Sequence, residues 1–139
     1  MTNQTPSRPY SARFDEHYWA PGHGLQEKQG VFIAGVGLTQ LAQKAAKNSG
    51  IVVAELGFGT GLNCALAAHT FIGHAQHGTP LVFYSFEAYP LPVRELEAIH
   101  AAWPAELAAL LAPVRAAWPA LTEGWNSILL SPSITLHLW

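Results

Sequence analysis

The fold follows from one stretch of sequence, Ile51-Val-Val-Ala-Glu-Leu-Gly-Phe-Gly-Thr-Gly61. Its first six residues form a nearly continuous apolar run that ends at a glycine, which predicts a strand buried on both faces of a parallel sheet. The apolar residues 62–72 predict a helix that ends near Gly73. A second apolar run, residues 81–86, predicts another strand. Strand, helix and strand make a βαβ unit, so the sequence predicts an α/β fold.

The segments around this unit add shorter elements. Apolar residues 31–33 predict a short strand, and Pro92 begins a predicted helix that continues to about Trp103. A second helical stretch, residues 105–117, contains Pro113, so we expect it to be kinked or divided in two.

Two further runs, residues 125–130 and 134–139, predict strands on either side of a short turn. Three of the predicted strands suit one parallel sheet, whereas a doubly wound sheet has about five or six. The expected fold class is therefore a Rossmann-like α/β domain, truncated after the third strand of its parallel sheet.

The glycine loop predicts a cofactor site. Gly57, Gly59 and Gly61 lie between the first strand and the helix, where the absence of a Cβ allows a tight turn and a close approach to a ligand. The GxGxxG dinucleotide fingerprint does not fit, because the sixth position is Leu62 counted from Gly57 and Cys64 counted from Gly59. No Lys-Ser or Lys-Thr pair follows, which excludes a P-loop.

Two acidic residues narrow the choice of cofactor. Glu55 lies beside the loop, where a carboxylate suits the positive charges of S-adenosylmethionine and would repel a pyrophosphate. Glu87 follows the second strand, where a carboxylate can accept hydrogen bonds from ribose hydroxyls. We therefore expect S-adenosylmethionine; a nicotinamide- or flavin-binding oxidoreductase domain is the alternative, which the glycine spacing opposes.

Composition limits the class of protein. The chain has 139 residues, enough for one domain, and only 12% of them are charged, against about 25% in an ordinary soluble domain. A net charge of −2 and scattered basic residues exclude a stand-alone nucleic-acid-binding domain. The single cysteine, Cys64, excludes an internal disulfide, and the polar start of the chain is no signal peptide, so we expect a cytoplasmic location.

Other features of the sequence are interpreted as parts of the fold, without a role in binding or catalysis. The apolar residues 51–72 contain Glu55 and several glycines, which favours a strand, loop and helix over a membrane span. No metal site is predicted, because no cysteine or acid accompanies the histidine cluster His69, His74 and His77. Four tryptophans are expected in the core: Trp103, Trp118, Trp125 and Trp139.

Several motifs along the chain resemble the methyltransferase domain of the MnmC/MnmD family. They are Phe14-Asp-Glu-His-Tyr18, Gly24-Leu-Gln-Glu27, Val31-Phe-Ile33, the stretch from Glu55 to Asn63, Ser85-Phe-Glu87-Ala-Tyr-Pro-Leu91 and His100-Ala-Ala-Trp-Pro104. The resemblance implies methyl transfer from S-adenosylmethionine to the aminomethyl nitrogen of the modified wobble uridine in tRNA. It also implies a fused or associated FAD-dependent oxidoreductase domain.

The resemblance assigns roles to particular residues. It implies that Gly57, Gly59 and Gly61 line the methionine part of the cofactor and that Glu87 holds the ribose. The other residues that it places in or near the site are Glu55, Phe58, Thr60, Asn63, Tyr18 and Glu27.

The resemblance also sets the expected domain organisation. We expect residues 1–12 to form a flexible leader and residues 13–139 to form the N-terminal part of a methyltransferase domain. The acidic motifs that the family carries further along are absent before Trp139, so no catalytic residue is named. A truncated Rossmann-like module without activity is therefore a further alternative.

Overall fold

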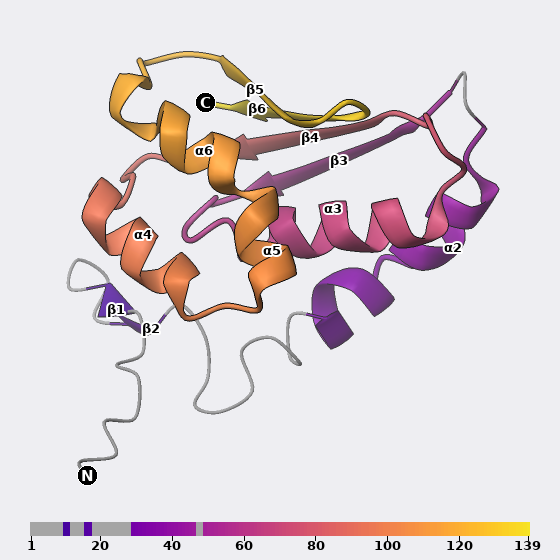
Figure 1. Ribbon diagram of the computed structural model, residues 1–139, viewed down its shortest axis with the longest axis horizontal. Coiled ribbons are helices and arrows are strands. Elements are labelled where there is room, and N and C mark those ends of the chain that lie inside the picture. Colours follow the sequence, from indigo (N-terminus) through magenta and orange to yellow (C-terminus); the bar gives the residue numbers. More distant parts are fainter. Residues whose placement is uncertain (1–9, 12–15, 18–28, 47–48) are drawn as a thin grey trace, which may run out of the picture.

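The computed structural model describes residues 10–11, 16–17, 29–46 and 49–139, and its architecture is α/β (Figure 1). The elements, in chain order, are β1 (Tyr10–Ser11), β2 (Glu16–His17), η1 (Gln29–Ala34), α2 (Leu38–Lys44), β3 (Ile51–Leu56), α3 (Leu62–His74), β4 (Leu81–Phe86), α4 (Val93–Ala101), α5 (Ala105–Leu110), α6 (Ala112–Ala117), η2 (Trp118–Ala120), β5 (Asn126–Ser131) and β6 (Ile134–Leu138). The two strands and the helix of the predicted βαβ unit are confirmed.

A four-stranded sheet with the order β3-β4-β6-β5 lies at the centre of the fold. The strands β3, β4 and β6 are mutually parallel, and β5 pairs antiparallel with β6. The order of the parallel strands corresponds to one half of a doubly wound sheet, so the structure is compatible with a Rossmann-like fold. The short strands β1 and β2 form a separate antiparallel pair.

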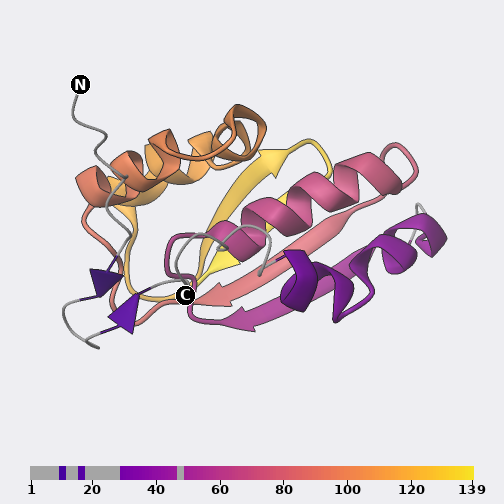
Figure 2. The ribbon, with the colours of Figure 1, turned by 90° about the horizontal axis from the view of Figure 1, so that it is seen from below.

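The larger helices lie on one side of this sheet (Figures 1 and 2). The residues of β4 that face them, such as Leu81 and Phe83, are fully buried. On the opposite face of β3, Val52 is 66% exposed and Leu56 is 88% exposed. The prediction that this strand is buried on both faces was therefore wrong, because no helix in the described part of the chain covers the second face.

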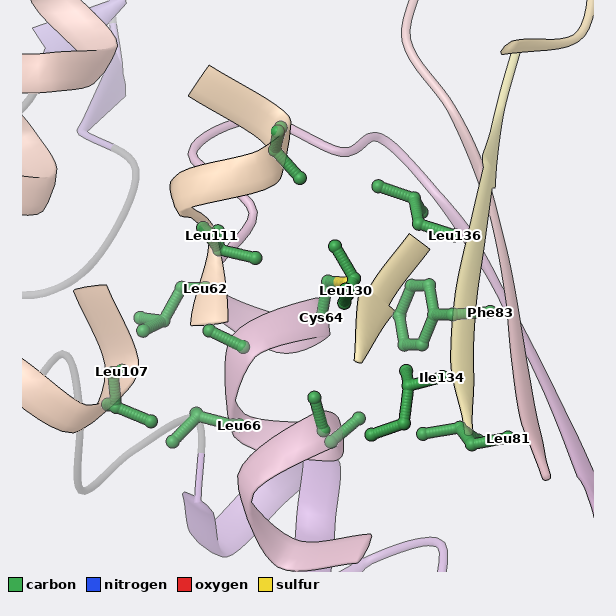
Figure 3. Close-up of a cluster of buried hydrophobic side chains, with 14 of the residues drawn as sticks. Leu62, Cys64, Leu66, Leu81, Phe83, Leu107, Leu111, Leu130, Ile134 and Leu136 are labelled. Carbon is green, nitrogen blue, oxygen red and sulfur yellow. The ribbon is translucent and has the colours of Figure 1, made fainter. Parts of the chain in front are cut away.

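The hydrophobic core fills the space between the helices and the covered face of the sheet. In Figure 3, Leu66 of α3 and Leu111 lie on the helical side, and Phe83, Ile134 and Leu136 lie on the strands. Each of these side chains is at most 1% exposed. Full burial of such a side chain contributes about 1.5–3 kcal/mol, so this layer fixes how the helices sit on the sheet.

Two predictions about local structure had different outcomes. The helical stretch before Trp118 is divided as expected, since α5 ends at Leu110 and α6 has Pro113 in its first turn. Residues 31–33 lie in the helical segment η1, so the strand predicted there was wrong. Their apolar run is instead explained by packing, because Phe32 contacts Phe83 across 6.4 Å between ring centroids.

The tryptophans divide into two groups. Trp103 and Trp118 are 9% and 7% exposed, as predicted for core residues. Trp125 and Trp139 are 48% and 54% exposed, so the prediction was wrong for these two. They contact each other on the uncovered face of the sheet, with ring centroids 5.3 Å apart.

In the part of the chain that the structure describes, no helix is long and apolar enough to cross a membrane.

Candidate functional site

The candidate site lies at the carboxyl ends of β3 and β4, toward which both arrowheads point in Figure 1. The parallel register pairs Leu56 with Phe86, so the residues that follow the two strands emerge side by side. The backbone N–H groups of Gly57 and Phe58 both donate to the Phe86 carbonyl oxygen, with N···O distances of 2.9 and 3.1 Å. The start of the glycine loop is thereby held against the end of β4.

The loop has a backbone that favours glycine. Gly57, Gly59 and Gly61 have φ angles of 87°, 57° and 77°, in the left-handed region. A Cβ at Gly61 would lie 2.6 Å from Phe58 Cζ and 2.8 Å from Leu111 Cδ1, whereas a Cβ at Gly57 would meet no heavy atom within 4 Å. Gly61 is thus required for packing, and the loop is open at Gly57.

Glu87 links the end of β4 to the glycine loop. Its Oε2 accepts a hydrogen bond from the Gly59 N–H at 2.7 Å, and its Oε1 accepts one from the Tyr89 N–H at 2.8 Å. An ionised carboxylate offers about four acceptor positions. Glu87 therefore keeps acceptor capacity for the hydroxyl groups of a ribose, and this capacity fits the predicted cofactor.

Glu55 lies beneath the loop, between two strands and the helix. Its Oε1 accepts a hydrogen bond from Ser85 Oγ at 2.9 Å, and its Oε2 accepts one from Asn63 Nδ2 at 3.0 Å. Burial, and secondarily the charge of Glu55, raises the pKa of the Cys64 thiol well above its usual value, so the thiol stays protonated. Contact of Glu55 with a cofactor stays a prediction; its bonds join β3, β4 and α3.

Phe58 and Thr60 attach the loop to the helices. The Phe58 side chain is 4% exposed, and its ring centroid lies 5.7 Å from that of Trp118. The Thr60 carbonyl oxygen lies 2.8 Å from Nε2 of His100 on α4. Both residues thus hold the loop from its buried side, and their part in a cofactor site stays a prediction.

Sequence reasoning gave no role at the site to Ser85 and His100, although each begins a motif of the family resemblance. Ser85 pairs in register with Glu55 on the neighbouring strand, so its place could have been found by aligning the two predicted strands. His100 is 40 residues from Thr60 in the chain, and no local pattern indicates their contact.

Two predicted site residues, Tyr18 and Glu27, lie outside the described residues. Among the residues that are described, no three histidine, cysteine or acidic side chains come together in a group able to hold a metal ion.

The strand, glycine loop, helix and second parallel strand place the chain among α/β proteins compatible with a Rossmann-like fold. No family model matches the chain. It is 38% identical over 117 residues to the "tRNA 5-methylaminomethyl-2-thiouridine biosynthesis bifunctional protein MnmC" of Nitrosospira multiformis. The aligned region covers 84% of this chain and 19% of that protein. It is 39% identical over 123 residues to the protein of the same name from Pseudomonas fluorescens, with 88% and 18% covered.

The chain is thus an MnmC-like sequence, and the resemblance predicted from its motifs is confirmed. It spans about a fifth of the length of these relatives.

Proposed function

We propose that this chain forms part of the S-adenosylmethionine site of a tRNA methyltransferase. The methyl acceptor is the aminomethyl nitrogen of the modified wobble uridine. One observation carries the proposal: the Gly59 N–H and the Glu87 carboxylate are 2.7 Å apart at the carboxyl ends of two parallel strands. This is the edge of a parallel sheet where Rossmann-like folds bind nucleotide cofactors.

Different residues of the described part of the chain bind different parts of the cofactor. Gly57, Gly59 and Gly61 let the backbone approach the methionine part, and Glu87 accepts hydrogen bonds from the ribose hydroxyls. Glu55 contributes negative charge beneath the loop, which favours a cofactor with positive charge. S-adenosylmethionine supplies an activated methyl group on its sulfonium. The residues of this chain bind and orient it, and none of them is proposed to transfer a proton.

The relatives support tRNA as the partner. Both are named for tRNA 5-methylaminomethyl-2-thiouridine biosynthesis, and both are called bifunctional. Because the match covers about a fifth of each, we assign the second activity, an FAD-dependent oxidoreductase, to a fused or associated domain. The single cysteine of the chain supports a cytoplasmic location for the reaction. The similarity to these proteins does not favour the alternative that this chain is itself a nicotinamide- or flavin-binding domain.

Calorimetric titration of the full chain with S-adenosylhomocysteine tests the proposal. We expect Glu87→Ala to weaken binding at least tenfold, which corresponds to about 1.4 kcal/mol. Glu97→Ala is the matched control, because Glu97 is an exposed acid on α4 and should leave the affinity unchanged. Equal affinity of the Glu87 variant and the wild type, or tighter binding of NAD than of S-adenosylhomocysteine, would contradict the proposal.

A further inference from the structure

A fully buried histidine touches the cofactor loop from behind. His100 on α4 is 1% exposed, and both of its ring nitrogens have hydrogen-bond partners. Nε2 lies 2.8 Å from the Thr60 carbonyl oxygen, and Nδ1 lies 2.9 Å from Arg115 Nη1. The ring also packs on Trp103, with centroids 4.3 Å apart. The imidazole is therefore fixed in position and in orientation.

Arg115 determines which ring nitrogen carries the proton. Its Nη1 donates one hydrogen bond to His100 Nδ1 and another, also of 2.9 Å, to the Ala108 carbonyl oxygen. Nδ1 must then accept, so Nε2 carries the hydrogen and donates it to Thr60. Burial lowers the pKa of His100, and the charge of Arg115 adds to this effect. The hydrogen bond to Thr60 acts in the opposite direction, but the pKa stays lowered, which favours this neutral form.

The contact fixes one peptide group of the glycine loop. The carbonyl oxygen of Thr60 accepts from His100, and the N–H of Gly61, in the same peptide, donates to the Phe58 carbonyl oxygen at 2.8 Å. The peptide is thus held at both ends. It immediately precedes α3, whose first N–H groups have no partner within the helix.

We propose that His100, oriented by Arg115, is a positioning residue that holds the cofactor loop in its binding conformation before the cofactor arrives. The inference rests on the proposed function. Glycine-rich segments lose more conformational entropy than others when they are ordered. A loop that is already ordered by contacts from the protein interior therefore binds its ligand more tightly.

Two substitutions at the same position separate positioning from simple core packing. His100→Gln keeps an N–H donor at about the reach of Nε2, whereas His100→Leu has a similar size and no donor. Both lose the ring contact with Trp103 equally. Val114→Ala is the matched control, because Val114 is a fully buried residue of α6 outside this hydrogen-bond chain.

The first measurement needs no cofactor. We expect hydrogen exchange of the Gly61 amide to be at least tenfold faster in His100→Leu than in the wild type, with exchange at Phe83 in β4 changed much less. His100→Gln should restore the wild-type rate within about threefold, and the Val114→Ala control should behave like the wild type at Gly61. Equal Gly61 rates in the Leu and Gln variants, or an equal acceleration in Val114→Ala, overturn the inference.

The second measurement is the affinity for S-adenosylhomocysteine. We expect it to be at least tenfold weaker in His100→Leu and nearly unchanged in Val114→Ala. If the wild type binds no S-adenosylhomocysteine, the proposed function fails, while the exchange measurement still decides whether His100 positions the loop. If exchange changes as expected but affinity does not, positioning for the cofactor is refuted.

If His100→Leu does not fold, Arg115→Met provides a second test of the same inference. This variant leaves the imidazole in place and removes the group that orients it. We expect Gly61 exchange to accelerate about threefold or more, and an unchanged rate contradicts the role of Arg115.

Discussion

The two faces of the central sheet use the same strands but have different surroundings. On the covered face, Phe83, Ile134 and Leu136 are fully buried beneath the helices. On the open face, Val52 and Leu129 are 66% and 61% exposed, although they are as apolar as their neighbours. The hydrophobic character of a residue therefore does not reveal which face it occupies.

The open face still has internal contacts. Trp125 lies edge-on to Tyr84, Phe86 and Trp139, with ring centroids 5.2 to 5.5 Å apart. Such aromatic pairs contribute about 0.5–1.5 kcal/mol each, less than burial in the core. The comparison teaches that stability comes mainly from the covered face, and the predictions below test that division.

The largest effect is expected from two matched leucines of the β5–β6 hairpin. Leu136→Ala should lower the free energy of unfolding by about 2–5 kcal/mol, because it leaves a cavity in the core. Leu129→Ala, on the open face, should cost no more than about 0.5 kcal/mol. Urea denaturation of both variants measures the difference, and similar losses would show that the open face is covered in solution.

A second pair of variants compares two glycines with positive φ. Gly61→Ala should cost about 1–2 kcal/mol for backbone strain alone, and more because the new Cβ would clash with Phe58. Gly78 has a φ of 84°, but a Cβ there would meet open space. Gly78→Ala should therefore lower the stability only by the cost of backbone strain. Thermal unfolding of the two variants separates the cost of strain from the cost of the clash. A smaller loss of stability in Gly61→Ala than in Gly78→Ala would contradict the packing of Gly61 against Phe58.

The third prediction concerns the aromatic cluster. Trp125→Ala should cost about 1 kcal/mol, less than the sum of its three edge-on pairs, because the position is half exposed and the energies of contacting residues do not add. Chemical denaturation measures this loss. A cost as large as that of Leu136→Ala would mean that the open face contributes as much to stability as the covered one.

The smallest effect expected is a pH dependence from His100. Its folded pKa is lowered by burial and by Arg115, the charged side chain that contacts the ring. The unfolded chain, with a histidine pKa of about 6.5, therefore binds the proton more readily. The contribution of His100 is fully present above about pH 6.5 and declines as the pH falls through the folded pKa.

His100→Gln supplies the comparison for this pH dependence. Denaturation between about pH 5 and 8 should show a smaller loss on acidification for the variant than for the wild type. Parallel curves would show that His100 does not remain neutral in the folded state.

Sequence analysis found the elements with strong local signals. The bounds of β3 and β4 agree with the predicted strands because apolar runs ended by glycines or polar residues have few alternative structures. Residues 31–33 were assigned wrongly because a short apolar run suits a buried helix as well as a strand. Trp125 and Trp139 were misplaced because residue type alone does not reveal what covers a strand.

The candidate site shows the same division. Gly57, Gly59, Gly61 and Glu87 were found because glycines and strand-end acids carry meaning within a few residues of sequence. The hydrogen bond between His100 and Thr60 was not predicted, because it joins residues 40 positions apart in the chain.

The sequence by itself determined the βαβ unit, the glycine loop with its acid, and the resemblance to MnmC proteins, because these depend on local periodicity and motif spacing. Only the tertiary structure decided which face of the sheet is covered, and it alone placed His100 behind Thr60 and Ser85 beside Glu55. The physical reason is that burial and hydrogen bonding between distant segments arise from packing, and packing is not encoded in any single stretch of residues.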